Sequence, residues 1–318
     1  MTMRFLFVMD PPERINPAAD TTFVLLEEAQ RRGHQILHCD AAQLSLEGTR
    51  PVAVVRPARV DRRAAPAMVL GPPATAGLGE MSAVLMRKDP PYDIDYHYAT
   101  LFLECARGQT VLVNDPRGLR DANEKLYAMN FPDFVPPSVT TRDGARLRAL
   151  LGELGGEMIV KPLHGFGGRG VLYLKEGDRN IPSILDTLTD EGRRWVVGQK
   201  YLPEARRGDK RIVLLDGEPL GAVLRVPRED EVRGNLHVGG RAEKTSLDER
   251  DRAICAALGP RLRADGLHLV GIDVIGPWLT EVNVTSPTGV QEINALDGVR
   301  LEAEILDWIE ARARAIRS

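Results

Sequence analysis

A glycine-rich stretch beside a lysine is the first part of the sequence that could do chemistry. A short apolar run ends at Lys161, and four glycines follow closely: Gly165, Gly167, Gly168 and Gly170. Glycines permit tight turns whose bare N–H groups can approach an anion, and Lys161 adds a positive charge. The stretch therefore predicts a phosphate-binding loop, with a glycine hairpin that binds no ligand as the alternative.

The residues around these glycines exclude two common nucleotide-binding motifs. Gly165, Gly167 and Gly170 match the spacing G-x-G-x-x-G, but the dinucleotide fingerprint needs a strand before it and a helix after it. Residues 171–174 instead predict a second strand, because they are few and include β-branched and aromatic side chains. No G-x-x-x-x-G-K-[ST] motif occurs. The glycine loop is therefore predicted to join two strands of a hairpin.

A second candidate site lies between residues 269 and 284, where two apolar runs flank a Gly-Pro pair. Alternation places Glu281 and Asn283 on one face of the second strand, and the turn brings Asp273 opposite Glu281. Two neighbouring carboxylates need a cation or a proton to offset their repulsion. Because hard oxygen ligands suit Mg²⁺, these three residues form a predicted metal site. The exposed polar face of an edge hairpin is the alternative.

Two further segments carry charged residues where a ligand could bind. Arg87 directly follows a predicted strand at 83–86, and the ends of strands in α/β domains are a common place for ligand contacts. Residues 227–240 have no periodicity and carry Arg228, Arg233 and Asn235. A long loop of this kind in a compact enzyme is typically a lid or a disordered segment.

The composition limits the class of protein. A chain of 318 residues predicts about two domains, and its 43% hydrophobic and 27% charged residues are typical of globular proteins. A net charge of −3 lacks the basic excess of a nucleic-acid-binding protein. Cys39, Cys105 and Cys255 have no metal-ligand spacing and are expected to be reduced thiols in the cytosol. No apolar run reaches the roughly 18 residues of a membrane span.

The first part of the chain predicts a small open α/β domain. The expected strands are 5–9, 35–39, 49–60, 83–86 and 111–114, and the expected helices are 21–32 and 97–107. Residues 62–79 are expected to form a loop because they are rich in Pro, Ala and Gly. A short helix at 121–130 is expected to carry Lys125, which without further context is an ordinary exposed lysine.

The second part of the chain predicts an α+β arrangement around the glycine loop. A helix at 142–154, the glycine hairpin, a helix at 181–191 and a strand at 195–199 form one unit. Strands at 212–215 and 222–226 flank an Asp-Gly turn. A helix at 247–264, capped by Ser246, precedes the predicted metal hairpin, and a helix at 299–316 ends the chain.

Together these features resemble the bacterial glutathione synthetases, a family of ATP-grasp ligases, along essentially the whole chain. The segments that carry the resemblance follow in order: VMDP at 8–11, EAQRRG at 28–33, LMRKDPP at 85–91, LRDANEKL at 119–126, GDKR at 208–211, RGNL at 233–236 and EVNVTSPT at 281–288. The resemblance implies an N-terminal open α/β domain at 1–122, followed by an ATP-grasp fold. In that fold, 123–202 would be a small glycine-loop lid subdomain and 203–318 the catalytic, metal-binding domain.

The resemblance also implies roles for individual residues. ATP would be bound by Lys125, Lys161, Gly165, Gly167, Gly168, Gly170, Gln199, Lys200, Tyr201, Leu202 and Asp209. Catalysis would involve Arg211, Arg225 and Arg233, and substrate binding would involve Arg87, Arg211, Arg225, Asn235 and Ser286. Two Mg²⁺ ions, or Mn²⁺ in their place, would be bound by Asp273, Glu281 and Asn283.

The reaction that the family implies joins γ-glutamylcysteine to glycine at the expense of ATP, through an acylphosphate. The implied partners are these small molecules, with no nucleic acid and no membrane, in a cytoplasmic homo-oligomer that would be a tetramer or a dimer. Two residues depart from the family pattern. Gln291 stands where an arginine is common, which affects recognition of the acceptor, and Arg169 lies in the glycine loop where a small residue is common.

Two other functions are alternatives. One is an ATP-grasp ligase that uses the same acylphosphate chemistry on another acid or another acceptor amine. The other is a nucleotide-binding protein without catalysis, against which the complete set of Asp273, Glu281 and Asn283 argues.

Overall fold

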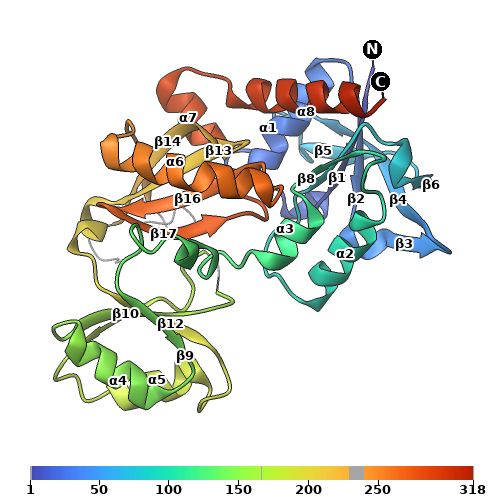
Figure 1. The fold of residues 1–318 in the computed structure, drawn as a ribbon. Coiled ribbons are helices and arrows are strands. Elements are labelled where there is room, and N and C mark those ends of the chain that lie inside the picture. Colours follow the sequence, from blue (N-terminus) through green and yellow to red (C-terminus); the bar gives the residue numbers. More distant parts are fainter. Residues whose placement is uncertain (1, 166, 229–239, 318) are drawn as a thin grey trace.

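Three β-sheets organise the molecule. The computed structural model describes residues 2–165, 167–228 and 240–317, and each sheet comes from its own stretch of chain, at 4–113, 138–200 and 209–283 (Figure 1). We call them the N-terminal sheet, the lid sheet and the third sheet. This mixed α/β and α+β architecture confirms the predicted fold class. Within the described ranges, no helix is long and apolar enough to cross a membrane.

The N-terminal sheet has a parallel centre. Its strand order is β3-β4-β2-β1-β7-β8, with β1 (Arg4–Val8) parallel to both β2 (Gln35–Cys39) and β7 (Ala83–Met86). The other strands are β3 (Leu44–Glu47), β4 (Arg50–Val60), β5 (Met68–Leu70), β6 (Ala74–Gly77) and β8 (Val111–Val113). Strands in the centre of a parallel sheet are covered on both faces, which explains the continuous apolar runs of β1 and β7.

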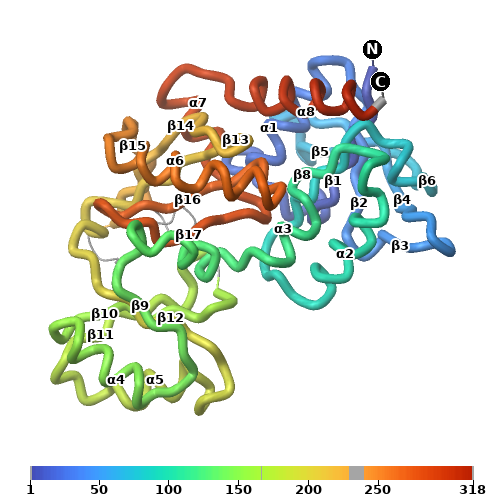
Figure 2. The backbone as a smooth tube through the Cα atoms, viewed as in Figure 1, coloured from blue at the N-terminus to red at the C-terminus, as the bar shows by residue number. Residues whose placement is uncertain are grey.

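Helices from both ends of the chain cover the N-terminal sheet. They are α1 (Thr21–Arg31), α2 (Ile94–Glu104), α3 (Pro116–Asp121) and α8 (Leu301–Arg317). The last helix runs beside α1 (Figure 2), and Ile305 and Ile309 share a buried core with Phe5 and Phe23. Helix α8 follows the third sheet in the chain, and its packing on α1 connects that part of the chain to the N-terminal domain.

The lid sheet is a separate four-stranded antiparallel unit. Its order is β11-β10-β12-β9, from β9 (Ser138–Thr141), β10 (Glu157–Pro162), β11 (Leu172–Lys175) and β12 (Val196–Lys200). Two helices, α4 (Gly144–Glu153) and α5 (Ile181–Thr189), cover one face. Leu147, Met158 and Leu185 belong to a buried cluster that is distinct from the two larger ones. Because the lid has its own core, it can move as a unit.

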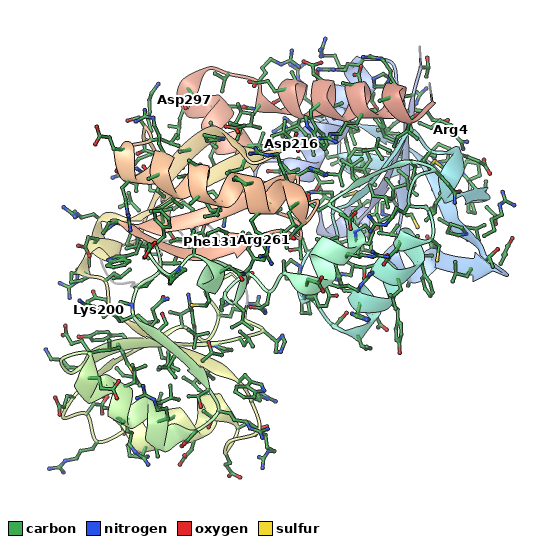
Figure 3. The ribbon with its side chains drawn as sticks, in the orientation of Figure 1. Arg4, Phe131, Lys200, Asp216, Arg261 and Asp297 are labelled. Carbon is green, nitrogen blue, oxygen red and sulfur yellow. The ribbon has the colours of Figure 1, made fainter. Side chains whose placement is uncertain are left out.

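The third sheet is antiparallel and faces the lid. Its order is β15-β14-β13-β16-β17, from β13 (Asp209–Leu215), β14 (Glu218–Val226), β15 (Arg241–Lys244), β16 (Leu269–Ile275) and β17 (Trp278–Asn283). Helices α6 (Glu249–Ala264) and α7 (Val290–Asp297) flank it. The predicted hairpin is confirmed, since Asp273 is the register partner of Glu281. Lys200, at the end of β12, lies on the side of the lid that faces this sheet (Figure 3).

The prediction of a helix around Lys125 was wrong. Helix α3 ends at Asp121, and a short 3-10 helix begins only at Tyr127. Between them, the side-chain oxygen of Asn123 accepts hydrogen bonds from the backbone N–H groups of Lys125 (3.0 Å) and Leu126 (3.1 Å). An asparagine side chain that bonds in this way turns the chain out of a helix, and so Lys125 lies on a turn.

Two other local predictions were also wrong. Residues 62–79 are not a plain loop, because β5 and β6 pair with the long strand β4. Helix α6 is capped by Asp248 rather than Ser246, since the Asp248 carboxylate accepts from the Asp251 N–H at 2.9 Å. Strands β3, β9 and β15 and helix α7 were not predicted. These elements are short, and short elements depend on their neighbours more than on their own pattern.

Candidate active site

Two lysines from different elements meet at one carboxylate. Lys161 ends the apolar part of β10, and its ammonium lies 3.4 Å from a carboxylate oxygen of Glu281 on β17. The ammonium of Lys125 lies 3.8 Å from the same oxygen and donates to the carbonyl of Gly165 at 2.7 Å. Both lysines are buried, at 5% and 3% exposure. Lys125 also pairs with the Glu124 carboxylate, and two converging buried ammonium groups suit a polyphosphate.

Burial and charge act differently on the two lysines. Burial lowers the pKa of Lys161, with the nearby Lys125 charge in the same direction and Glu281 opposing them. At Lys125 burial also acts to lower the pKa, but Glu281 and Glu124 outweigh it and raise the pKa above its usual value. Lys125 is therefore held firmly as a cation, while Lys161 gains most from an added negative charge.

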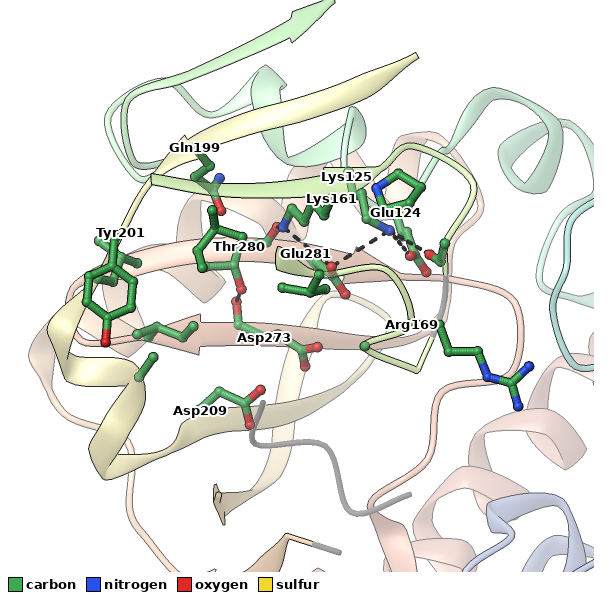
Figure 4. A pocket seen from close by; sticks show the side chains of 18 of the residues that line it. Glu124, Lys125, Lys161, Arg169, Gln199, Tyr201, Asp209, Asp273, Thr280 and Glu281 are labelled. Atoms are coloured by element: carbon green, nitrogen blue, oxygen red, sulfur yellow. Dashed lines mark hydrogen bonds and ion pairs between the residues drawn. The ribbon is translucent and has the colours of Figure 1, made fainter. Parts of the chain in front are cut away.

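The lysines line a cleft between the lid sheet and the third sheet, which we call the lid cleft (Figure 4). It measures about 930 Å³ including its open mouth. From the lid it is lined by Lys161, Gln199, Lys200, Tyr201, Leu202 and the glycine loop, and from the third sheet by Asp209, Asp273, Ile275, Thr280 and Glu281. The cleft has an apolar end near Tyr201 and a charged end near Lys125, as a base with attached phosphates requires.

The glycine loop covers the charged end of this cleft. Gly165, Gly167 and Gly168 line it, and Gly167, Gly168 and Gly170 have φ between +61° and +75°, a region that L side chains rarely adopt. A side chain at Gly170 would in addition lie 2.9 Å from the Pro162 ring. The loop therefore requires glycine for its backbone shape, which is the expected property of an anion-binding turn.

The opposite end of the lid cleft is formed where β12 ends. Tyr201 and Leu202 are 9% and 6% exposed, and the Tyr201 ring lies 4.7 Å from that of Tyr173. The Gln199 amide donates to the Ser138 hydroxyl at 3.0 Å. Lys200, by contrast, is exposed. Backbone groups just beyond the end of a strand, next to apolar side chains, are well suited to a flat heteroaromatic ring.

Arg211 and Arg225 form a cluster with Asp273 and Asp209 on the third sheet. Arg211 contacts the Asp273 carboxylate at 2.5 and 3.0 Å, and Arg225 contacts it at 3.0 Å. Arg225 also makes two hydrogen bonds to Asp209, at 2.6 and 2.8 Å. Burial acts to raise the pKa of Asp273, but the two arginines outweigh it and hold the pKa well below its usual range. Burial and the Asp273 charge raise the pKa of Asp209.

Both arginines line a second cleft of about 1,430 Å³, which we call the arginine cleft. Its lining includes Arg14, Asp20, Asp89, Arg211, Arg225, Asn283, Ser286 and Thr288. It shares Glu124, Gly167, Arg169, Asp273 and Glu281 with the lid cleft. The two clefts therefore form one chamber, with cations on both sides of a central carboxylate pair.

Asn283 and Ser286 lie in this chamber, but Arg87 does not line either cleft. The Asn283 amide is 3.4 Å from Asp273, and the Ser286 hydroxyl donates to Asp89 at 2.7 Å. Arg87 is only 3% exposed and donates to the Thr22 hydroxyl (3.1 Å) and the Pro287 carbonyl (3.0 Å). The Arg87 side chain thus lies behind the lining of the arginine cleft and is hydrogen-bonded to Pro287, one of the lining residues.

Arg233 and Asn235, and most of the loop 226–240, lie outside the described residues. In the described part of the chain, no group of three or more His, Cys, Asp or Glu side chains is arranged to hold a metal ion. The three predicted metal ligands are two carboxylates and one amide, so they are not a group of this kind.

Glu124 is a residue of the site that the sequence did not indicate. It lines both clefts, its carboxylate accepts a hydrogen bond from the Lys125 ammonium, and its backbone carbonyl accepts from the Val282 N–H at 2.8 Å. Burial and the Glu281 charge raise its pKa. The only signal in the sequence was that Glu124 is next to Lys125. Its place in the site depends on the hydrogen bond with Val282, which lies 158 positions later in the chain.

The two departures from the family pattern have separate structural settings. The Gln291 amide donates to the Asp20 carbonyl (2.7 Å) and accepts from Arg62 (2.9 Å), so it joins α7 to the start of α1. Arg169 lines both clefts, and its guanidinium points away from Lys125 and Lys161 (Figure 4).

A glycine loop with two lysines over a sheet that carries paired carboxylates defines the class of protein, an ATP-grasp ligase. Comparison with known families identifies the branch. The model of the prokaryotic glutathione synthetase N-terminal domain matches residues 3–120, and the model of that family's ATP-grasp domain matches residues 124–298. The chain belongs to the prokaryotic glutathione synthetase family, which confirms the resemblance stated from its motifs.

Full-length relatives agree with this assignment. The chain is 47% identical over 315 residues to the glutathione synthetase of Gloeobacter violaceus, with 96% of each chain covered. It is 43% identical over 314 residues to the glutathione synthetase of Mesorhizobium japonicum, with 99% of this chain and 100% of that one covered. The chain is therefore a ligase of this family over its whole described length.

Solved structures share the fold at much lower identity. A D-cycloserine synthetase matches with a TM-score of 0.65 and 19% identity, over 98% of this chain and 99% of that one. A peptide-modifying ATP-grasp ligase of Chryseobacterium gregarium, solved with ADP and a leader and core peptide, matches with a TM-score of 0.66 and 13% identity, over 98% and 97%. At these identities the likeness shows the ATP-grasp fold alone.

Proposed function

We propose that the joined clefts form glutathione from γ-glutamylcysteine and glycine through an acylphosphate, and release ADP and phosphate. The observation that carries this proposal is the meeting of two lysines and two arginines on opposite sides of Asp273 and Glu281. A carboxylate is not attacked by an amine at neutral pH unless it is first activated. In this arrangement one side receives the phosphates of ATP and the other receives the acid that is activated.

The lid cleft would hold ATP. Gln199, Lys200, Tyr201 and Leu202 would contact the adenine, and Asp209 would also contact the nucleotide, because all five line the lid cleft. Lys125 and Lys161 would neutralise the phosphates, and the loop from Gly165 to Gly170 would close over them with its N–H groups. Phosphoryl transfer needs little from the protein beyond positioning and neutralisation of charge, and these residues supply both.

The hard oxygen ligands of Asp273, Glu281 and Asn283 fit Mg²⁺, which prefers such donors and leaves positions for phosphate oxygens. The two carboxylates are register partners on β16 and β17, and Asn283 lies within 3.4 Å of Asp273. When bound, two Mg²⁺ ions, or Mn²⁺ in their place, would be held by these three residues and would stabilise the negative charge that develops during phosphoryl transfer. Arg211 and Arg225 keep Asp273 ionised for this role.

The arginine cleft would hold γ-glutamylcysteine. Arg211 and Arg225 would orient the cysteinyl carboxylate towards the γ-phosphate, and Ser286, Asn235 and Arg233 would complete the substrate and catalytic groups around it. Arg87 would act by holding the segment around Pro287 in place. The amine of glycine would then attack the acylphosphate. Because acylphosphates hydrolyse readily, we assign closure of the site to the loop 226–240 and the lid.

The proposal extends to the cell and to assembly. Reduced thiols and small-molecule substrates suit a cytoplasmic enzyme, and we propose a homo-oligomer, a dimer or a tetramer, as the resemblance implies. The domain division at 1–122, 123–202 and 203–318 is part of the same proposal.

Phosphate release tests the reaction. The purified protein is incubated with ATP, Mg²⁺ and γ-glutamylcysteine, and each of several amino acids is added separately. We expect glycine to give turnover well above every other amino acid, with glutathione as the product. Equal turnover with other amino acids would favour an ATP-grasp ligase for another acceptor, and nucleotide binding without phosphate release would favour a non-catalytic protein.

A further inference from the structure

Helix α2 presents an apolar face to solvent. Ile94, Tyr98 and Leu101 are 62%, 51% and 39% exposed, and Cys105, directly after the helix, is also exposed. Spacings of four, three and four residues put these side chains on one face of a helix. Exposed apolar residues are common singly, but a stripe of four on one helix marks a contact surface.

The opposite face of α2 already packs into the protein. Tyr96, Ala99 and Leu103 are at most 2% exposed and belong to the core of the N-terminal domain. The elements beside α2 are α3, β3 and the short 3-10 helix η2 (Ala41–Gln43), and none of them covers the stripe. A helix that is apolar on both faces is normally buried on both. The exposed face is therefore incomplete in a single chain.

The stripe is separate from the active site. Ile94, Tyr98, Leu101 and Cys105 line neither the lid cleft nor the arginine cleft. In Figure 1, α2 lies at the outer edge of the N-terminal domain, on the other side of that domain from α8. Leu46, on the neighbouring strand β3, adds another apolar side chain that is 40% exposed.

The charges at the two ends of α2 are complementary to each other. The N-terminal end carries Asp93 and the exposed Asp95. Around the C-terminal end three arginines, Arg107, Arg117 and Arg120, exceed the two carboxylates that they contact, Glu104 and Asp115. If two α2 helices lie antiparallel, the acidic end of each meets the basic end of the other. A second copy of this chain therefore matches the stripe in both shape and charge.

We infer that the Ile94–Tyr98–Leu101–Cys105 face of α2 is the contact between two copies of this protein across a two-fold axis. The inference rests on the proposed self-association and names its surface. In an isologous contact residue i meets residue j and j meets i, so the centre of the stripe sets the register. Tyr98 then packs on Leu101 of the second copy, and Ile94 packs on Cys105 of the second copy.

The size of the stripe sets the expected strength of the contact. One helix face with a neighbouring leucine covers less than the roughly 800 Å² per partner of a standard interface. The association is therefore expected to be reversible and to depend on protein concentration.

Sedimentation of the full chain tests the surface. The double variant Tyr98→Glu/Leu101→Glu places two carboxylates in the centre of the contact, and Val69→Glu is the matched control because Val69 is 57% exposed on β5, elsewhere on the protein. Across about a hundred-fold range of concentration, we expect the wild type and Val69→Glu to form dimers or tetramers. We expect the double variant to lose this contact and to sediment as the 35.0 kDa chain, or as a dimer if the wild type is a tetramer. Unchanged phosphate release would show that the variant is folded.

The possible failures can be told apart. A wild type that is monomeric throughout contradicts both the proposed self-association and this surface. A double variant that associates to the same extent as the wild type, or a control that does not associate, contradicts the surface alone. Because the stripe is outside both clefts, neither result bears on the proposed reaction.

A disulfide cross-link tests the register through a product that is gained, the covalent dimer, rather than through a loss of association. Ile94→Cys would face the native Cys105 of the second copy, whereas two Cys105 residues would lie about 16 Å apart along the helices, beyond the reach of a disulfide. With diamide, which takes two electrons and two protons from a pair of thiols, we expect Ile94→Cys to give a covalent dimer. The wild type and Ile94→Cys/Cys105→Ser should give none. A dimer from all three proteins, or from none, contradicts the register.

Discussion

At the scale of single residues, Glu281 joins the parts of the chamber. Its carboxylate is the shared neighbour of Lys125 and Lys161, and its register partner Asp273 is the shared neighbour of Arg211 and Arg225. The two lysines thus share one carboxylate and the two arginines share the other, and these carboxylates are register partners. A charge that enters on either side changes the balance for the whole cluster.

Replacement of Glu281 by Gln should separate two effects. If Glu281 is a metal ligand, turnover with Mg²⁺ should fall by at least about 100-fold, the loss typical of a removed charge-stabilising group. Because Lys161 would then lack its carboxylate partner, while Lys125 would keep Glu124, ADP without metal should bind more tightly than to the wild type. Phosphate release and calorimetric titration of ADP in EDTA measure the two effects. Glu304→Gln, at an exposed position on α8, is the control, and a Glu281→Gln variant with normal turnover would remove the proposed metal site.

The sequence predicted single residues only where a regular pattern connected them. Strand alternation and a Gly-Pro turn were sufficient to pair Asp273 with Glu281. Asn123, two residues before Lys125, was a local signal for the turn that was not used. Nothing local could reveal that Glu124 lies in the site, because this depends on its hydrogen bond with Val282 in a distant part of the chain.

At the scale of elements, a buried carboxylate connects α1 to α8. Glu28 on α1 accepts hydrogen bonds from Arg31 and Arg32 at 2.7 Å and pairs with Arg300, just before α8. Arg32 extends the network to Asp307 (2.6 Å) and Glu310 (2.7 Å) on α8. The pairing of β5 and β6 with β4 is a similar case. Like the contact between α1 and α8, it depends on a partner that a local sequence pattern cannot show. Helices α1, α4, α5, α6 and α8 were predicted to within two residues at each end, because a local pattern shows them, whereas the arrangement of 62–79 was not predicted.

The Glu28 network predicts a specific response to acid. The hydrogen bond from Arg31, together with Arg32 and Arg300, outweighs burial and lowers the pKa of Glu28 from 4.5 to about 2. A carboxylate with a depressed pKa in the folded state stabilises that state above its unfolded pKa, and this stability is lost as the pH falls from 4.5 to about 2. The shift corresponds to about 3 kcal/mol. Glu28→Gln should therefore be less stable than the wild type by about this amount at pH 7, with a difference that shrinks below pH 4.5.

Urea unfolding between pH 7 and pH 3 measures this difference. Glu153→Gln is the matched control, because its pair with Arg146 is exposed and such pairs contribute less than about 1 kcal/mol. A Glu28→Gln variant whose deficit is constant over the whole range would show that the loss comes from packing rather than from the charge.

At the scale of the whole molecule, the lid and the third sheet line one cleft but have different buried cores. The lid has its own buried cluster, and the residues of the third sheet belong to the two larger clusters that include the N-terminal strands. The family resemblance implied a separate lid, whereas the length of the chain predicted only about two domains. The sequence could not predict that α8 returns to α1, because an amphipathic helix shows that it packs but not on which partner.

Nucleotide binding should therefore protect one interface selectively. If ADP with Mg²⁺ binds in the lid cleft as proposed, it would contact both the lid and the third sheet, so it should reduce their separate opening, and at 100 times its dissociation constant it would stabilise the bound state by about 2.7 kcal/mol. Hydrogen exchange of backbone amides in β10, β12, β16 and β17 should slow by up to about 100-fold, while β1, β2 and β7 change little. Lys161→Ala should abolish this protection, and Lys175→Ala, which removes an exposed lysine from the same hairpin, should retain it. Equal protection of all three sheets would instead mean that the molecule opens as a single unit, and the lid could not then act as a separate cover on the nucleotide.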